Sequence, residues 1–340
     1  MPRAIRPLLA ALSLSLLLPI SAPLPAEESS SSGEVAGDQG VALDPPAADP
    51  SRPAPTERSA DAARALSRHL PSQEQQLLQS GDETFLALWR PANTAEAHGV
   101  VVLVAGAGES ADWPKVLGPL RRRLPDGGWH SLSLSLPDPQ DSLPPAPDAK
   151  TANAPAATAA PAPVDADPGA ADEPLPVADA APADPSPQAD QPLQDPGERH
   201  AQRIRQRIAA ALELARQQQA KHIVLLGHGS GGYWSTRYLS EERPTDVRSL
   251  LLVDVQPAAE ASPRLDELQA SLKLATGDFY YQDRQLERQA AARRAQASRR
   301  QEHPAYTQVA LKALPGNPEI EQEQLYRRLR GWLTARLKAR

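Results

Sequence analysis

The chain has 340 residues, a formal net charge of −6 and no cysteine. The lack of cysteine excludes disulfide bonds and lipid attachment through a thiol, so a packed core alone must hold the fold. The small net charge excludes no class of partner by itself, and the distribution of charge along the chain is more informative.

The first 26 residues have the layout of a secretory signal peptide. Met1–Arg6 carry two arginines, Leu8–Ile20 form an apolar run, and small residues and prolines lead to Ala26. We expect cleavage after Ala26 and a periplasmic mature protein. The apolar run is too short to span a membrane comfortably, so no transmembrane span is expected after cleavage.

Two low-complexity segments, residues 27–57 and 138–196, are rich in proline, alanine and acidic residues, and Lys150 is the only base of the second. Such segments bury too little apolar surface to offset the entropy of ordering, so both are predicted to be disordered. A lid or a spacer is one interpretation of 138–196, and a tolerated surface insertion is the simpler one. The remaining residues, 58–137 and 197–340, are expected to form one domain.

Strands and helices are expected to alternate through this domain. The order begins with a short helix at 61–70, a strand hairpin at 76–79 and 84–90, a buried strand at 100–104, a helix at 112–124 and a strand at 129–136. It continues with a helix at 198–218, strands at 223–226, 247–253, 271–275 and 306–311, and helices at 233–239, 284–300 and 319–337. This alternation predicts an α/β fold, with a mostly parallel sheet and helices on both faces.

Glycine-rich turns follow two of the buried strands. Gly227–Gly232 reads GHGSGG between a strand and a helix, and Ala105–Ser110 follows the strand at 100–104. The first turn resembles the nucleophile elbow of α/β-hydrolases, G-x-S-x-G, and the second resembles their oxyanion loop. The chain thus resembles the α/β-hydrolase superfamily over about Gln76 to Leu337. More narrowly it resembles a group of exported bacterial proteins, a domain of unknown function, in which the elbow serine is replaced.

Two alignments of the elbow are possible. The apex residue has a positive φ and needs small residues two positions before and two positions after it. With Gly229 at the apex these are Gly227 and Gly231, whereas with Ser230 at the apex His228 would stand where a glycine is needed. We therefore place Gly229 at the nucleophile position and keep Ser230 as the alternative nucleophile.

The resemblance implies a chain order of nucleophile, acid and histidine. Asp278, in Gly277-Asp278 after the expected strand at 271–275, is the first acid candidate, and Asp254 at the end of the strand at 247–253 is the second. The base should follow the last strand, where Asn317 stands instead, and His303 before that strand is the remaining histidine candidate.

The resemblance also implies that backbone N–H groups of Ala107 and Ser230 face the former substrate site. No two histidines stand at metal-ligand spacing, so neither a metal nor a cofactor is expected.

The C-terminal third is rich in arginine. Solvated helix faces are the simpler interpretation, and contact with an anionic envelope component or with the acidic segment 138–196 is the alternative. Nucleic acid is not expected as a partner, because few aromatic residues accompany the bases. The residues proposed for an anionic partner are Arg288, Arg293, Arg294, Arg299 and Arg300.

The sequence therefore predicts an exported α/β-hydrolase-like pseudoenzyme that binds a ligand or serves as a scaffold in the cell envelope. The alternative is an active serine esterase or acyl hydrolase that uses Ser230 and a histidine recruited from elsewhere. A third hypothesis is a passive envelope-associated protein whose disordered segments make the contacts.

Overall fold

The computed structural model describes residues 56–139, 195–256 and 261–338, all within the unit Pro53–Arg340. The expected signal peptide, residues 1–26, lies outside the described residues, as do all but the last residues of 27–57 and all but the ends of 138–196. In the described part of the chain, no helix is both long enough and apolar enough to cross a membrane.

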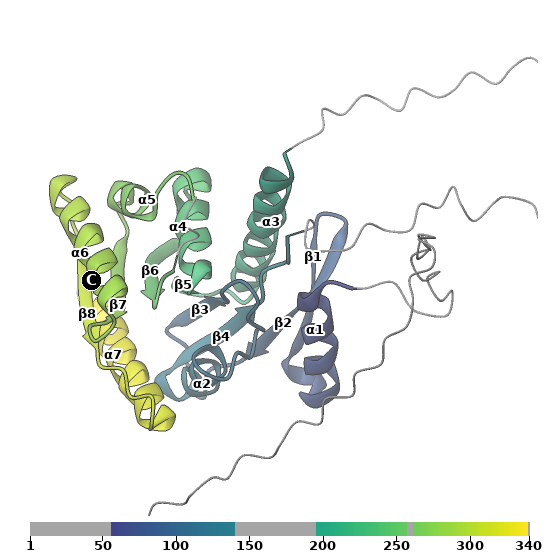
Figure 1. The fold of residues 1–340 in the computed structure, drawn as a ribbon. Helices are drawn as coiled ribbons and strands as arrows, with labels where there is room; N and C mark the ends of the chain where they lie inside the picture. The colour runs from purple at the N-terminus through teal and green to yellow at the C-terminus, as the bar shows by residue number, and fades with distance from the viewer. Residues whose placement is uncertain (1–55, 140–194, 257–260, 339–340) are drawn as a thin grey trace, which may run out of the picture. The chain divides into compact units, whose positions relative to one another are not determined.

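One eight-stranded sheet forms the centre of the fold, with the strand order β1-β2-β4-β3-β5-β6-β7-β8 (Figure 1). Strand β2 pairs antiparallel with both β1 and β4, and all other neighbouring strands are parallel. The strands are β1 Gln75–Ser80, β2 Glu83–Arg90, β3 Gly99–Val104, β4 Trp129–Leu134, β5 Ile223–His228, β6 Val247–Val253, β7 Ala275–Tyr281 and β8 Tyr306–Leu311.

Helices cover both faces of the sheet. On one face, residues of α3, α4 and α5 share a core cluster, and α6 contacts β7 and β8. On the other face, residues of α2 and α7 share a second core cluster. Helix α1 packs beside β2. The helices are α1 Arg58–His69, α2 Leu117–Arg123, α3 Pro196–Gln217, α4 Ser230–Glu242, α5 Leu265–Ser271, α6 Gln285–Arg300 and α7 Pro318–Lys338, with short 3₁₀ turns at Ser72–Glu74 and Pro125–Gly127.

Strand β3, at the centre of the sheet, is apolar throughout because both of its faces are covered. All six residues of β3 are buried, and their side chains alternate between the two cores. Val100, Val102 and Val104 enter the core under α3 and α4, while Val101 and Leu103 enter the core under α2 and α7. The two-residue period of a strand thus divides one valine-rich run between two layers.

The structure confirms the predicted α/β class and the predicted hairpin, but one strand prediction is wrong. Residues 265–271 form α5, and the strand expected at 271–275 is β7, Ala275–Tyr281. Thr276-Gly277-Asp278 suggested a turn, yet these residues lie inside the sheet. Gly277 packs so closely that an added Cβ would lie 2.9 Å from Leu251 Cδ2. Tertiary packing overrides the local turn preference here.

Because β3 to β8 are parallel, their carboxyl ends meet at one edge of the sheet. The loops after β3, β5, β6 and β7 therefore lie along this carboxyl edge. This edge is where the candidate site forms.

Candidate functional site

The turn between β5 and α4 is a strained glycine turn. Gly229 precedes the first residue of α4 and has φ 54° and ψ −128°, a conformation that side-chain-bearing residues rarely adopt. A Cβ on Gly227 would lie 2.4 Å from Gly231 O, and one on Gly231 would lie 2.4 Å from Ala105 O. The turn therefore needs glycine on both sides of Gly229, and it presents no hydroxyl at its apex.

The loop after β3 contacts the start of α4 directly. The backbone N–H of Ala107 donates a hydrogen bond of 2.7 Å to Ser230 Oγ. The structure thus brings together the two residues whose N–H groups were expected to face the former substrate site. The side chain of Ser230, however, occupies the Ala107 donor, which would otherwise be available to a substrate oxygen.

A buried carboxylate–imidazole pair joins the same loop to the end of β5. Glu109 Oε2 lies 2.7 Å from His228 Nδ1 and accepts a hydrogen bond of 2.8 Å from the N–H of Gly106. The side chains of His228 and Glu109 are 8% and 16% exposed. This contact holds the loop after β3 against the glycine turn.

Sequence reasoning missed the Glu109–His228 pair. The available signal was register: β3 and β5 are parallel neighbours with Val104 opposite Gly227, so His228 follows directly beside the loop that carries Glu109. A histidine at a strand end and an acid in the adjoining loop are then within reach of each other.

Asp254 follows β6 at the same edge, with a positive φ of 47°. Its Oδ2 accepts a hydrogen bond of 2.6 Å from Arg284 Nη1. Two residues on, the N–H of Gln256 donates to Gly229 O at 3.3 Å, so this loop is tied to the glycine turn. Asp254 is therefore close to the turn in the fold, but its carboxylate is engaged with an arginine.

Glu287 of α6 lies next to Asp254 and Arg284. Burial and the neighbouring Asp254 carboxylate raise the pKa of Glu287 to about 7. Its Oε1 accepts a hydrogen bond of 2.9 Å from the N–H of Tyr281, and Arg284 Nη1 lies 3.7 Å from its Oε2. The carboxyl edge thus holds an acid that titrates near neutral pH.

Asp278 lies inside β7 rather than in a loop, which corrects the expected acid loop. Its side chain is fully buried, and Arg294 binds both oxygens with hydrogen bonds of 2.8 and 2.9 Å. Tyr306 and Gln308 of β8 also donate to Oδ2, at 2.5 and 3.1 Å. The carboxylate is held in the core beneath α6, where it joins that helix to β7 and β8.

Among the described residues, the histidine candidate His303 makes no hydrogen bond to the glycine turn. His303 stands just before β8, at the amino end of the parallel strands, and so lies at the edge of the sheet opposite Gly229. Its Nδ1 accepts a hydrogen bond from the N–H of Ala305, and burial lowers its pKa. Asn317 does follow β8 at the carboxyl edge, where its backbone N–H donates to Leu314 O at 2.8 Å.

The arginines expected to form a basic surface on α6 do not all face solvent. Arg294 is 2% exposed and paired with Asp278, so it is removed from that surface. Its position follows the helical period of the buried residues Glu287, Ala291 and Ala297. The exposed members are Arg288, Arg293, Arg299 and Arg300.

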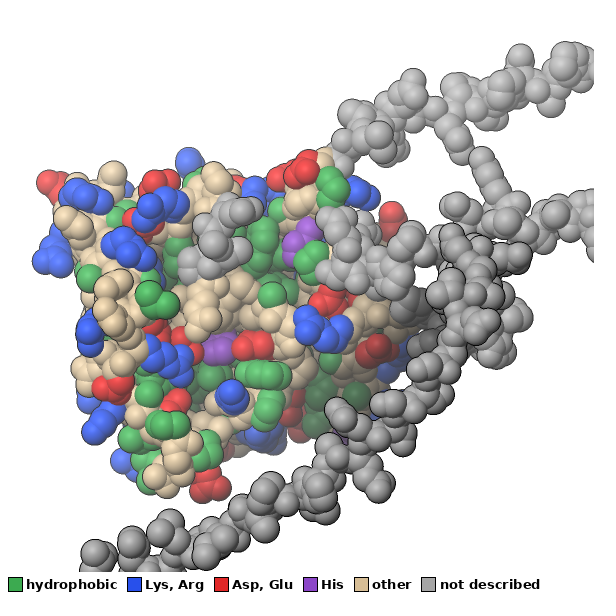
Figure 2. Space-filling model, viewed as in Figure 1, with side chains coloured by type: hydrophobic (Ala, Val, Ile, Leu, Met, Phe, Trp, Pro, Cys, Tyr) green, Lys and Arg blue, Asp and Glu red, His purple; other side chains and the backbone are tan. Residues whose placement is uncertain are grey.

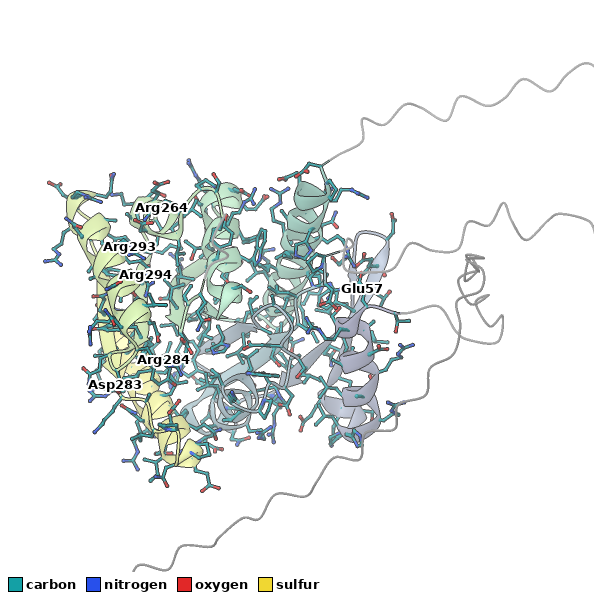
Figure 3. All side chains as sticks on the ribbon, viewed as in Figure 1. Glu57, Arg264, Asp283, Arg284, Arg293 and Arg294 are labelled. Atoms are coloured by element: carbon teal, nitrogen blue, oxygen red, sulfur yellow. The ribbon has the colours of Figure 1, made fainter. Side chains whose placement is uncertain are left out.

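A cavity of about 950 Å³ opens between α5, α6 and the residues after β6. Four arginines line it, and Figure 3 shows two of them on α6 and the other two just before the first residues of α5 and α6. In the space-filling view, basic side chains are frequent over these two helices (Figure 2). The arginines are Arg264, Arg284, Arg293 and Arg294. Among the described residues, no group of three or more histidine, aspartate or glutamate side chains could hold a metal ion.

The order of the strands, the single reversed strand β2 and the glycine turn after β5 give the chain the α/β-hydrolase fold, as the sequence predicted. The esterase Pf2001 of Pyrococcus furiosus is similar, with 10% identity, a TM-score of 0.49, and coverage of 77% of this chain and 90% of that chain. Est1E from Butyrivibrio proteoclasticus has 8% identity and a TM-score of 0.48, with coverage of 77% and 99%.

The esterase domain of a Rhodothermus marinus protein has 13% identity and a TM-score of 0.45, with coverage of 75% of this chain and 97% of that domain. No curated protein matches the chain. A family model described as "Protein of unknown function (DUF3530)" matches residues 8–335, nearly the whole of the chain. The protein therefore belongs to the DUF3530 family.

Proposed function

We propose that this protein is a non-catalytic member of the α/β-hydrolase fold that binds a ligand or partner in the cell envelope. The observation that carries the proposal is the glycine turn: Gly229 holds the strained conformation of an elbow but has no side chain to attack a substrate. The fold alone does not imply hydrolysis, which depends on groups at the site.

The contacts of Ser230 support the same conclusion. A serine nucleophile needs a base that removes its proton and N–H donors that stay open for the oxyanion. Ser230 Oγ instead accepts the hydrogen bond of Ala107, and within the described residues no imidazole contacts it. The adjoining His228 is engaged through Nδ1 with Glu109.

The envelope location rests on the N-terminal sequence. Arginines before an apolar run at Leu8–Ile20, followed by small residues up to Ala26, are typical of an export signal. A mature N-terminus at Glu27 in the periplasmic fraction, identified by mass spectrometry, is the expected result. An intact Met1 in the cytoplasmic fraction would contradict export.

Covalent labelling tests the lack of catalysis. A fluorophosphonate probe reacts with activated serines, so we expect the purified protein to remain unlabelled. Ser230→Ala serves as the site variant, and Ser240→Ala, in the same helix, is the matched control. Labelling that disappears in Ser230→Ala and persists in Ser240→Ala would replace the proposal with its alternative.

That alternative is a serine esterase that uses Ser230. The observation in its favour is the Glu109–His228 pair, because a carboxylate at Nδ1 is the arrangement that orients a catalytic imidazole. It would require His228 Nε2 to take the proton of Ser230 Oγ, a contact absent among the described residues.

A further inference from the structure

The cavity between α5 and α6 is built from residues that the elbow does not use. It touches the glycine turn only at its border, where Gln256 N–H donates to Gly229 O and the Val255 side chain packs against Gly232. Its volume of about 950 Å³ matches that of small-molecule sites, which range over about 300–1,000 Å³. A ligand can therefore occupy it without contacting the apex of the turn.

Its charges favour an anion. Three of the four lining arginines are paired: Arg264 with Asp266, Arg284 with Asp254, and Arg294 with Asp278. Arg293 is exposed and makes no hydrogen bond or ion pair with any described residue. Its guanidinium is therefore available to a ligand, and it can bind a carboxylate or phosphate with two hydrogen bonds.

The acids of the cavity reduce this positive charge only in part. Asp266 is neutralised by Arg264, with contacts of 3.1 and 3.2 Å. Burial raises the pKa of Glu287 to about 7, so this acid is only partly ionised near neutral pH. Arg293 is thus left without a full opposing charge among the lining residues.

The cavity also has an apolar part. Leu265 and Val255 are buried in its wall, and Ala290 lies on α6 one turn beyond Leu286. Leu286 is 81% exposed, although removing a leucine side chain from water lowers the free energy. An exposed leucine and an unpaired arginine two turns apart on the cavity side of α6 fit a ligand that has both an apolar body and a charged group.

We propose that this cavity binds an amphipathic anion, a long alkyl chain that ends in a carboxylate or phosphate, with the anionic group on Arg293 and the chain on Leu286 and Leu265. The inference deepens the proposed function by naming a ligand class, and it rests on the part of that function that assigns the protein a bound ligand.

Isothermal titration calorimetry on the mature protein tests the proposal with dodecanoate and dodecyl phosphate, each below its micelle concentration. We expect saturable binding of at least one of them, and the two arms distinguish a carboxylate from a phosphate ligand. Dodecanol lacks the charge and acetate lacks the chain, so both should bind at least about tenfold more weakly. Equal binding of dodecanol, or no binding of either anion, would overturn the proposal.

Variants locate the site. Arg293 and Leu286 are exposed, so we expect Arg293→Gln and Leu286→Asn to leave the fold intact. Each variant should weaken binding about tenfold. Arg300→Gln, on the same helix outside the cavity, is the matched control and should bind as the wild type does. Binding unchanged in both site variants would place the ligand elsewhere and overturn the proposal.

A separate readout distinguishes this proposal from the proposed function. Turnover of p-nitrophenyl dodecanoate reports on catalysis, whereas calorimetry reports on the cavity. Ser230-dependent turnover with intact anion binding would refute the lack of catalysis but keep the cavity. If the wild type bound neither anion and did not turn over the ester, the cavity proposal would fail and the proposed lack of catalysis would stand.

Discussion

The three glycines around the turn after β5 differ in their surroundings. A Cβ on Gly229 would meet only Gly106 Cα, at 3.6 Å, which is ordinary contact. Cβ atoms on Gly227 and Gly231 would instead meet backbone at 2.4 Å. The choice of residue at the apex is therefore limited by the backbone conformation, and the choice at Gly227 and Gly231 is limited by close packing.

This difference predicts an order of stability among alanine variants. Gly229→Ala should lower the free energy of unfolding by about 1–3 kcal/mol, the cost of a strained backbone. Gly227→Ala and Gly231→Ala should each cost more than about 3 kcal/mol, because backbone atoms cannot move aside without disturbing β5 and α4. Urea unfolding measures all three.

Gly331→Ala is the control for these variants. Nothing lies within 4 Å of its Cβ position in α7, so alanine should stabilise the helix by up to about 1 kcal/mol. A Gly229 variant as costly as the Gly227 variant would mean that packing, not conformation, restricts the apex.

Glu287 makes stability depend on pH. Burial raises its pKa to about 7 from a value of 4.5, so the folded state holds this proton more tightly than the unfolded state does. Its contribution to stability is complete below about pH 4.5 and is lost as the pH rises through about 7. The full loss amounts to roughly 3 kcal/mol, because the pKa rises by about 2.5 and each pKa unit corresponds to about 1.4 kcal/mol.

Glu287→Gln removes this titration and keeps an oxygen for the Tyr281 N–H. We expect the variant to gain stability relative to the wild type as the pH is raised from about 5 to about 8. Urea unfolding across this range measures the difference, and other titrating groups cancel in it. A difference that does not change with pH would refute the raised pKa.

At the scale of elements, a buried ion pair joins α6 to the sheet. Arg294 reaches from the buried face of α6 to Asp278 in β7, and Tyr306 of β8 donates to the same carboxylate. Burial and the neighbouring Asp278 carboxylate raise the pKa of Tyr306. One buried acid thus positions a helix and two strands.

A double-mutant cycle tests this arrangement. Asp278→Ala leaves Arg294 buried without a partner, so it should cost about 3–5 kcal/mol, and Arg294→Met should cost a similar amount. The double variant should be less destabilised than the sum of the two, because neither charge remains unpaired. Additive losses would show that the pair is not coupled.

The same elements mark the limit of prediction from the sequence. The buried runs of β3, β5 and β6 were predicted because a strand covered on both faces contains a continuous run of apolar residues. Strand β7 was placed too early because Asp278 in a strand interior is favourable only with Arg294, a residue 16 positions away. Local sequence does not reveal that partner.

At the scale of the whole molecule, the glycine turn was predictable because its spacing is local. The Glu109–His228 pair required the order of β3 and β5 in the sheet, which spans 119 positions of sequence. The cavity required the placement of α5 against α6, and α5 itself was not predicted. A motif within one turn can be predicted from the sequence, whereas a site formed by distant elements can be located only once the fold is known.

The molecule as described retains the backbone of an elbow and a neighbouring N–H donor, without a hydroxyl at the apex. An open oxyanion hole that lacks nucleophile and base gives about 10³–10⁴-fold catalysis over water. Because Ser230 Oγ occupies the Ala107 donor here, we expect less than that. Slow ester hydrolysis that does not depend on Ser230 or His228 is therefore compatible with the proposed non-catalytic role.

Steady-state hydrolysis of p-nitrophenyl butyrate, measured for the wild type, Ser230→Ala, His228→Ala and the control Ser240→Ala, tests the central claim most directly. The proposed lack of a catalytic nucleophile predicts kcat/KM values within about threefold of one another for all four proteins. A loss of about 100-fold or more in Ser230→Ala and His228→Ala, with Ser240→Ala unchanged, would show a working nucleophile and base and would contradict it.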